Sequence, residues 1–500
     1  MEFFDHLALG FAVVLSPTNL LYCLIGTVIG TAIGVLPGLG PLATVAMLLP
    51  LTVGLSPVTG LIMLAGIYYG SQYGGSTTAI LINLPGESAS AVTTIEGYRM
   101  AQRGRAGPAL AAAGIGSFVA GTFATLLIAL LAVPLAKAAL NFGPAEYFSL
   151  MVVGLILSIG LASGSVIKAI GMMFLGLLLG LTGQDVYTGT PRFTFGQQDL
   201  LGGIDLSALI VGLFGISEIL RNLESGEMRG SIARIGTLWP SRDDARRMVA
   251  PTLRGTLIGS FLGILPGGGA TLSSFVAYAV EKRVSSKSAE FGSGAIEGVS
   301  APEAANNAGA QTSFIPMLSL GIPGNPIMAI MIGAMIMQGI TPGPTVATRN
   351  PDLFWGLIVS MWVGNVMLVI LNLPLLGIWV RLLRIPYSIL FPGIVTICAI
   401  GAYSVDKSLF AIYIVAISAA LGYLFVKLDC EIPPLVLGFV LGPMLEEYLR
   451  RALITAEGDP SIFFTRPISA TLLALAVVIL VVVCVPFVAK RRTEIFVEDT

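Results

Sequence analysis

Long runs of apolar residues, separated by short polar or Pro- and Gly-rich breaks, follow one another along most of this chain. A straight helix needs about 20 apolar residues to cross a bilayer, and several of the runs are shorter than that. The pattern therefore predicts an all-α polytopic membrane protein with roughly 11–15 hydrophobic segments, some of them tilted or re-entrant. The runs lie at residues 19–36, 42–55, 108–135, 147–163, 165–181, 206–220, 353–380, 388–401, 408–426, 433–448 and 468–489.

One stretch, residues 304–325, is too polar for a plain membrane helix and too apolar for a surface loop. It contains no charged residue, but it carries many amide and hydroxyl groups. Because an unpaired polar group in a dry environment costs about 2–7 kcal/mol, such a cluster indicates a polar ligand. Pro316, Gly321, Pro323 and Gly324 interrupt the helix, which is tolerated at membrane depth only inside protein or beside a cavity. The polar residues are Asn306, Asn307, Gln311, Thr312, Ser313, Ser319 and Asn325.

Two Pro-Gly phrases occur twice in the same order. Gly34–Gly40 returns as Gly263–Gly269, an offset of 229 residues (263 − 34), and Leu84-Pro85-Gly86 returns as Ile322-Pro323-Gly324, an offset of 238 (323 − 85). We interpret this as a duplication. The expected parts are an interfacial segment at 1–18, repeat 1 at 19–221, a cytoplasmic linker at 222–250, repeat 2 at 251–450, a final transmembrane segment within 451–492 and a cytoplasmic tail at 493–500.

Positive charge indicates how each repeat is oriented, because cytoplasmic loops are enriched in Lys and Arg. The loop at 97–105 carries three Arg, whereas its counterpart at 339–351 has one. Conversely, the loop at 281–287 is basic and its counterpart at 52–57 is uncharged. The basic side changes between the copies, which predicts two inverted-topology repeats with broken hairpins, as in secondary transporters.

Inverted repeats bring their broken segments together near the midplane, where transporter substrates bind. Helix starts offer N–H groups and a positive dipole end to an anion. Since the hairpins lack Lys and Arg, we expect Na⁺ or H⁺ to accompany an organic anion, with any Na⁺ held in the same hairpins. Glu87 and Glu303 flank the hairpins; we favour solvated edge carboxylates, with proton or cation sites as the alternative. The candidate substrate- and ion-binding residues are Pro37, Gly38, Gly40, Ser71, Gly74, Gly75, Ser76, Thr77, Thr78, Asn83, Gly86, Gly267, Gly268, Thr271, Asn306, Asn307, Gly309, Gln311, Thr312, Ser313, Gly321, Pro323, Gly324 and Asn325.

Composition and motifs narrow the function further. Only 11% of the residues are charged and the net charge is −1, which argues against nucleic acid as a partner. The single histidine, His6, is near the N-terminus, and neither an ATP-binding nor a hydrolase motif occurs, so we expect no enzyme and no cofactor. Two alternatives stay open: a passive organic-anion channel, and polar residues that only join helices to one another.

Several of these motifs resemble those of one family. Tyr73–Ser90, Gly34–Gly40, Pro302–Ala308 and Leu320–Gly324 are similar to the large membrane subunit of tripartite tricarboxylate transporters, TctA, and the resemblance spans about residues 15–450. Gln311 departs from the uniformly small run expected there. The resemblance implies a multi-pass protein of the bacterial inner membrane that takes up di- or tricarboxylates. It also implies a small TctB-like membrane subunit and a TctC-like periplasmic substrate-binding protein as partners, and a moving unit that carries both hairpins.

Overall fold

The chain folds into two packed units whose chain segments alternate. Unit 1 consists of Met1–Pro134 and Glu218–Gly401, and unit 2 of Leu135–Ser217 and Ala402–Thr500. Each predicted repeat thus contributes its hairpin-bearing part to unit 1 and its remaining part to unit 2. The computed structural model describes residues 2–36, 39–139, 141–160, 165–185, 187–225, 233, 235–265, 269–383 and 387–484.

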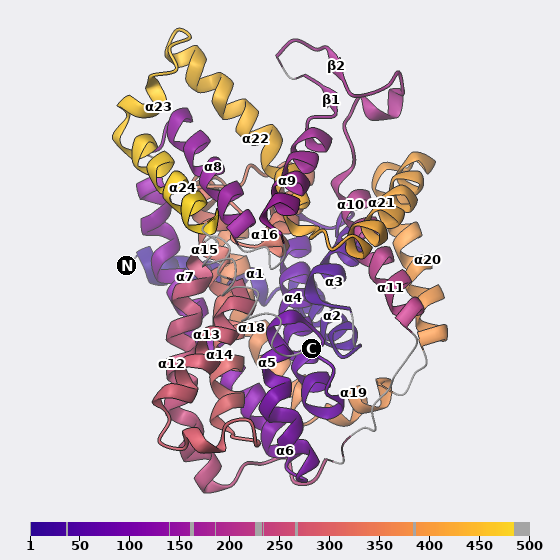
Figure 1. Ribbon diagram of the computed structural model, residues 1–500, viewed down its shortest axis with the longest axis vertical. Coiled ribbons are helices and arrows are strands. Elements are labelled where there is room, and N and C mark those ends of the chain that lie inside the picture. The colour runs from indigo at the N-terminus through magenta and orange to yellow at the C-terminus, as the bar shows by residue number, and fades with distance from the viewer. Residues whose placement is uncertain are drawn as a thin grey trace. The chain divides into compact units, whose positions relative to one another are not determined.

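Unit 1 is built from helices that are interrupted by tight turns and short 3-10 or π turns (Figure 1). Three helices, α7 (Ala106–Ala139), α11 (Ser217–Ser225) and α20 (Tyr387–Asp406), cross a boundary between the units. The other elements of unit 1 are α1 (Glu2–Val14), α2 (Pro17–Gly34), α3 (Pro41–Leu48), η1 (Leu49–Thr52), α4 (Pro57–Ile82), η2 (Ser88–Ser90), α5 (Ala91–Thr93), η3 (Thr94–Tyr98), α6 (Arg99–Gln102), α12 (Arg242–Ile264), α13 (Gly269–Val284), η6 (Ser288–Glu290), α14 (Glu297–Thr312), α15 (Phe314–Leu320), α16 (Pro326–Met337), α17 (Val346–Arg349), α18 (Pro351–Asn372) and α19 (Leu376–Leu382). Proline begins α2, α3, α4, α16 and α18, because its fixed φ suits the first helical position, where no N–H is needed.

The described part of unit 2 is also helical, apart from one small hairpin of two short strands within residues 183–192. Asp205 begins its α10 by accepting the N–H of Ala208 at 2.7 Å. The elements of unit 2 are α8 (Pro144–Gly160), α9 (Val166–Gly180), β1 (Gly183–Gln184), β2 (Pro191–Arg192), η4 (Gln198–Leu200), α10 (Leu206–Ile210), η5 (Val211–Ile216), α21 (Leu409–Lys427), α22 (Pro433–Thr455), α23 (Ile462–Thr465) and α24 (Pro467–Cys484).

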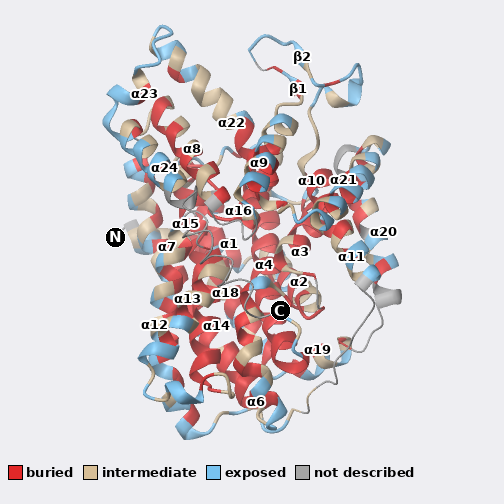
Figure 2. Ribbon diagram, viewed as in Figure 1, coloured by how far each residue is buried: buried red, intermediate tan, exposed pale blue. Residues whose placement is uncertain are grey.

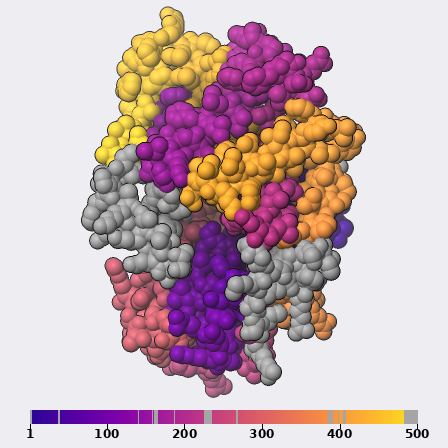
Figure 3. Space-filling model, turned by 45° about the vertical axis from the view of Figure 1, so that its right-hand side comes forward, coloured from indigo at the N-terminus to yellow at the C-terminus, as the bar shows by residue number. Residues whose placement is uncertain are grey.

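Five helices in the described part of the chain are long and apolar enough to cross a membrane, and further apolar helices have 10–17 residues. On α21 an exposed apolar stripe repeats every three or four residues, as on a helix that faces lipid. Figure 3 shows the orange segment that contains α21. The stripe consists of Leu409, Tyr413, Ile417, Leu421 and Leu424. Membrane character is therefore confirmed, while the number of 11–15 segments stays a prediction.

Within unit 1, α2 packs on α4 as α12 packs on α14. At three glycines of α2 an added Cβ would lie 2.3–2.4 Å from a carbonyl oxygen of α4, and at three glycines of α12 it would lie 2.1–2.4 Å from one of α14. The offsets are 229 for the glycines (255 − 26) and 238 for their partners (301 − 63), the same two offsets as in the Pro-Gly phrases. This agreement supports a duplication, and the inversion of one copy stays a prediction. The pairs are Gly26–Met63, Gly30–Ile67 and Gly34–Ser71, and Gly255–Ala301, Gly259–Ala305 and Gly263–Gly309.

Both Leu/Ile-Pro-Gly phrases end one helix and begin another. Asn83 ends α4 with φ 59°, and Gly321, the equivalent position in the second copy, ends α15 with φ 73°. Four residues later, Glu87 and Asn325 are both extended, with φ −152° and −155°, and each caps the next helical segment. We call Asn83–Glu87 tip 1 and Gly321–Asn325 tip 2. The two tips are built alike; their re-entrant placement in a bilayer stays a prediction.

The start of α12 differs from the start expected for repeat 2. The helix begins at Arg242, inside the range expected for the linker, and Pro251 lies within it. Ser241 and Asp244 form a capping box that starts the helix earlier. Asp244 also pairs with Arg105, so tertiary contacts hold the charged first turns in helical form.

Candidate functional site

Two polar helices, α4 and α14, are buried over almost their whole length (Figure 2). They come from the two predicted repeats, and both belong to unit 1. Because a buried polar group without a partner is costly, we expect most of their polar side chains to be hydrogen-bonded. The contacts between these helices therefore identify the residues that the fold gathers into one place.

The carboxylate of Glu303 in α14 lies where the two copies meet. Its side chain is 1% exposed. Its Oε2 accepts the hydroxyl of Ser76 in α4 at 2.7 Å, and its Oε1 accepts the hydroxyl of Thr93 in α5. The interpretation of Glu303 as a solvated edge carboxylate is therefore wrong. The interpretation failed because the hairpin of the other repeat covers Glu303.

The described Lys and Arg side chains of unit 1 that form ion pairs do so with other acidic residues. Their partners are Glu218, Asp244, Glu281, Glu290 and Glu297. Glu303 is thus held by hydroxyl groups alone within the described part of the chain. A carboxylate buried without a basic partner needs a bound proton or a bound cation to neutralise its charge.

Glu87 of tip 1 reaches across to the other copy. Its Oε1 accepts Nδ2 of Asn306 at 3.0 Å, and Glu87 as a whole residue is intermediate in exposure. The amide oxygen of Asn306 is buried and has no hydrogen-bond partner, and the same is true of Oε1 of Gln72. Unpaired buried acceptors of this kind need an explanation, and a bound cation or a hydrogen-bond donor on a ligand supplies one.

Each tip lies beside the glycine-rich phrase of its own repeat. At tip 1, an added Cβ on Gly40 would be 3.8 Å from the carbonyl oxygen of Gly86. At tip 2, an added Cβ on Gly269 would be 3.8 Å from Cβ of Asn325, whose Oδ1 accepts the N–H of Met328 at 2.9 Å. The starts of α3 and α13 are therefore close to the two tips.

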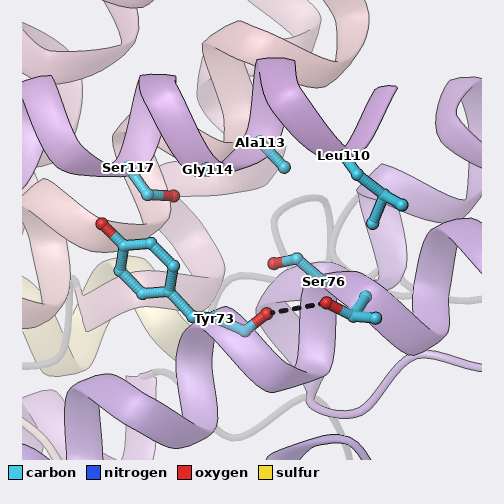
Figure 4. Close-up of a pocket in the computed structure, with 7 residues that line it drawn as sticks. Tyr73, Ser76, Leu110, Ala113, Gly114 and Ser117 are labelled. Carbon is cyan, nitrogen blue, oxygen red and sulfur yellow. Dashed lines mark hydrogen bonds between the residues drawn. The ribbon is translucent and has the colours of Figure 1, made fainter. Parts of the chain in front are cut away.

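A small cavity lies between α4 and α7 (Figure 4). It has a volume of about 10 Å³, counted as the space open to the centre of a water molecule. Ser117 projects into it from α7, and its Oγ accepts Nδ2 of Asn307 at 2.6 Å. This polar contact joins α7 to α14, and it places Asn307 behind the cavity. The lining residues are Tyr73, Ser76, Thr77, Leu110, Ala113, Gly114 and Ser117.

Several candidate residues have their polar groups satisfied away from this site. Four hydroxyls, those of Ser71, Thr78, Thr312 and Ser313, donate to carbonyls of their own helices. Gln311 accepts the hydroxyl of Thr125 in α7 at 2.8 Å. For these residues, helix packing explains the polar group.

The remaining candidates are backbone positions or lie at the edge of the site. Gly74 packs on α2, Thr271 is partly exposed in the first turn of α13, and Pro323 lies within tip 2. Gly75 and Gly309 allow close approach of neighbouring segments, whereas an added Cβ on Gly324 would only reach ordinary contact with Pro316. Pro37, Gly38, Gly267 and Gly268 lie outside the described residues.

Sequence reasoning missed three residues that shape the site. Thr93 donates to Glu303, and Gln72 carries one of the unpaired acceptors. Asn365 of α18 accepts the hydroxyl of Tyr73 at 2.8 Å and donates to the carbonyl of Phe118 at 2.9 Å. A polar residue inside the apolar run 353–380 was the available signal for Asn365. No cluster of three His, Cys, Asp or Glu suited to a metal occurs among the described residues.

In a comparison with known proteins, residues 20–437 match a family model described as "Tripartite tricarboxylate transporter TctA family". The chain is 57% identical, over the full length of both chains, to the "Uncharacterized 52.8 kDa protein in TAR-I ttuC' 3'region" of Agrobacterium vitis. It is also 57% identical to the "Uncharacterized protein in TAR-II ttuC' 3'region" of the same organism, over 48% of this chain and all of the relative. No solved structure gives a significant match.

Proposed function

Since the chain belongs to the tripartite tricarboxylate transporter TctA family, we propose that it is the subunit that carries di- or tricarboxylates across the membrane. The substrate binds between tip 1 and tip 2. The TctA family is a transporter family rather than an enzyme family, and the large apolar helices agree with a membrane location.

The main support for this proposal is that the two tips are built alike and that tip 1, at the end of α4, is hydrogen-bonded to α14 of the other repeat. Asn83 and Gly321 end helices in the same left-handed conformation, and Glu87 and Asn325 cap the segments that follow. The N-terminus of α16 supplies the N–H of Ile327 and a positive dipole end to a substrate carboxylate. At tip 1 the equivalent cap is already a carboxylate, so the anion binds nearer to tip 2.

Transport is coupled to a cation and needs two partner proteins. Helix-end dipoles are worth about 0.3–2 kcal/mol each, too little for a multiply charged ligand without Lys or Arg. A co-bound cation therefore offsets part of the substrate charge. The family is that of the large subunit of a tripartite system; a TctB-like subunit and a TctC-like periplasmic binding protein complete it in the bacterial inner membrane. Unit 1, which holds both tips, moves as the transport unit.

The test is uptake of a panel of mono-, di- and tricarboxylates by proteoliposomes that contain the complete transporter. Asn325→Asp keeps a good N-cap but adds a negative charge beside the proposed anion. Two charges 5 Å apart repel by about 3 kcal/mol at an effective dielectric constant of about 20, so carboxylate affinity falls roughly 100-fold. The melting temperature stays at the wild-type value.

Ser56→Asp is the matched control. Ser56 caps the opposite end of α4, where it is exposed and accepts the N–H of Thr59 at 3.3 Å. Its replacement adds the same charge at a helix start away from both tips, and uptake stays within twofold of wild type. Equal uptake by the Asn325→Asp and wild-type proteins contradicts the proposed binding site. Downhill flux without accumulation against a gradient would instead indicate a passive channel.

A further inference from the structure

Glu303 differs from the other buried acids described in unit 1 in the kind of partner that holds it. The residue is 1% exposed, and among the described residues its carboxyl group bonds only to the hydroxyls of Ser76 and Thr93. Each of the other acids has at least one partner that can only donate, which is a backbone N–H group for Glu96 and an arginine for Asp244, Glu281 and Glu297. Such donors hold a carboxylate in its ionised form, whereas a hydroxyl oxygen can also accept a hydrogen.

The hydroxyl of Ser76 has an acceptor for its hydrogen whether or not Glu303 carries a proton. Its Oγ lies 2.7 Å from Oε2 of Glu303 and 3.3 Å from the carbonyl oxygen of Gln72, one turn earlier in α4. When Glu303 is ionised, Ser76 donates to the carboxylate. When Glu303 is protonated, its O–H donates to Oγ of Ser76, and Ser76 turns its own hydrogen to Gln72. Because only one hydroxyl hydrogen has to rotate, the carboxyl group can bind and release a proton without leaving Ser76 unpaired.

Acceptors without a donor occur on both helices that form this contact. Among the described residues, Oε1 of Gln72 and Oδ1 of Asn306 are buried and have no hydrogen-bond partner. Gln72 lies one turn before Ser76 in α4, and Asn306 lies one turn after Glu303 in α14. A carboxylate adds only acceptors to such a contact, whereas a protonated carboxyl group contributes a donor. The local hydrogen bonding therefore favours the protonated form of Glu303.

The ionisable groups around Glu303 do not compensate a negative charge on it. Two of them face Glu303: Tyr73 of α4, whose hydroxyl donates to Asn365 at 2.8 Å, and Glu87 of tip 1, which is itself an acid. Charged and ionisable groups on the other elements packed against α14 bond to one another, in the pairs Arg247–Glu297, Arg254–Glu281 and Tyr278–Glu96. An ionised carboxylate in a dry site is so costly that, without a positive partner, the group takes up a proton instead.

We propose that Glu303 is the proton-binding site of the transporter and that the proton it carries is the coupling ion. The proposal rests on the proposed function, because it identifies both the coupling ion and the residue that binds it. On one side of the membrane a proton from water forms the O–H bond of Glu303. On the other side that bond breaks, the proton returns to water, and nothing is oxidised or reduced. A neutral Glu303 also leaves less negative charge in unit 1 when the carboxylate substrate binds.

Glu303 contacts the chain on both sides of tip 1, which links the proton to the substrate. Ser76 lies in α4, before the tip, and Thr93 lies in α5, after it. Loss of the proton leaves an uncompensated charge under this hairpin, which loosens its contact with α14. Asn306 of α14 also donates to Glu87 of tip 1 at 3.0 Å. The proton and the carboxylate therefore favour the same position of tip 1, and each strengthens the binding of the other.

The first experiment uses proteoliposomes that contain the complete transporter, in Na⁺-free buffer, and the carboxylate of the panel that the wild type accumulates best. Glu303→Gln keeps the side-chain shape and donates a hydrogen bond permanently, as the protonated acid does. It loses accumulation driven by a pH gradient, but it exchanges internal for external carboxylate at close to the wild-type rate. Glu297→Gln in the same helix is the control, because Arg247 retains Glu290 as a partner. The control accumulates carboxylate as the wild type does.

The second experiment follows the proton itself by infrared difference spectroscopy on the purified full-length protein between about pH 5 and pH 9. The wild type shows the C=O band of a protonated carboxyl group that disappears as the pH rises, and Glu303→Gln lacks this band. Thr93→Val removes a hydrogen bond that favours the ionised form, so the band persists to a pH higher by up to about one unit.

Several outcomes overturn the proton site. Accumulation driven by a pH gradient that is unchanged in Glu303→Gln places the coupling proton elsewhere. Loss of exchange together with accumulation, in a Glu303→Gln protein whose melting temperature is within about 2 °C of wild type, makes Glu303 a packing or substrate-binding residue. A wild-type spectrum without a pH-dependent carboxyl band that Glu303→Gln removes, or an unchanged band in Thr93→Val, also contradicts the proposal.

The failure of this inference differs from failure of the proposed function. Carboxylate uptake that is driven by a Na⁺ gradient and is indifferent to a pH gradient removes the coupling proton and leaves carboxylate transport intact. A pH-dependent carboxyl band that is lost in Glu303→Gln, together with no uptake of any carboxylate under any ion gradient, leaves Glu303 as a proton-binding group and removes the proposed function.

Discussion

Replacing Gly86 by Ala tests the packing of tip 1 against α4. An added Cβ would lie 2.3 Å from Cα of Gly75 and 2.7 Å from the carbonyl oxygen of Gly34. Both neighbours are backbone atoms within helices, so neither can rotate away. Since ordinary contacts begin near 3.4 Å, tip 1 must move by about 1 Å.

The cost follows from that displacement. Overpacking of this kind destabilises by about 1–3 kcal/mol. The hydrogen bond between Glu87 and Asn306 is 3.0 Å long, and a further 1 Å or so takes it beyond hydrogen-bonding range. A typical hydrogen bond contributes about 1 kcal/mol, and because this one holds tip 1 in place we expect its loss to lower carboxylate affinity roughly fivefold.

Two glycines of the same motifs provide controls. Gly324 is the equivalent position at tip 2, where an added Cβ would meet its nearest atom, Cγ of Pro316, at 3.4 Å. At Gly40 the nearest atom would be 3.8 Å away. Both Ala variants should therefore transport at close to the wild-type rate. Uptake kinetics in proteoliposomes and melting curves in detergent compare the three variants. If Gly86→Ala transports within twofold of Gly324→Ala, the contact geometry at tip 1 is not what limits binding.

Two further predictions concern groups away from the tips. Glu96→Gln lowers the free energy of unfolding of unit 1 by about 1–3 kcal/mol, because a buried carboxylate that accepts the N–H groups of Gly292, Gly294 and Ala295 becomes an amide with an unpaired donor. Faster proteolysis within 285–296 checks this, with the exposed Glu457→Gln as control; unchanged cleavage contradicts it. In the loop after α9, the backbone N–H of Thr188, with help from that of Tyr187 and from Arg450, lowers the pKa of Asp185 to about 2. A lowered pKa stabilises the charged form, so its contribution is complete above the unfolded pKa of about 4 and is lost as the pH falls through about 2. Hydrogen exchange at 183–192 should increase over that range, and Asp185→Asn should show the increase already at pH 5; equal exchange in both proteins at pH 5 would refute this role.

The sequence by itself predicted the features that local chemistry controls. Pro, Gly and Asn at the two Pro-Gly phrases predicted helix breaks, and the structure has them at Asn83 and Gly321. The two offsets in the sequence reappear in the glycine contacts of α2 with α4 and of α12 with α14. Long apolar runs predicted membrane helices because their length and composition suffice for that inference.

Only the tertiary structure decided which polar residues share a site. Three hydrogen bonds of the site join residues that are far apart in the sequence. The separations are 292 positions for Tyr73 and Asn365, 210 for Thr93 and Glu303, and 190 for Asn307 and Ser117. The direction of each of these side chains depends on how distant helices pack, and no local pattern encodes that. For the same reason the sequence did not reveal that Glu303 is buried, since the segment that covers it belongs to the other repeat.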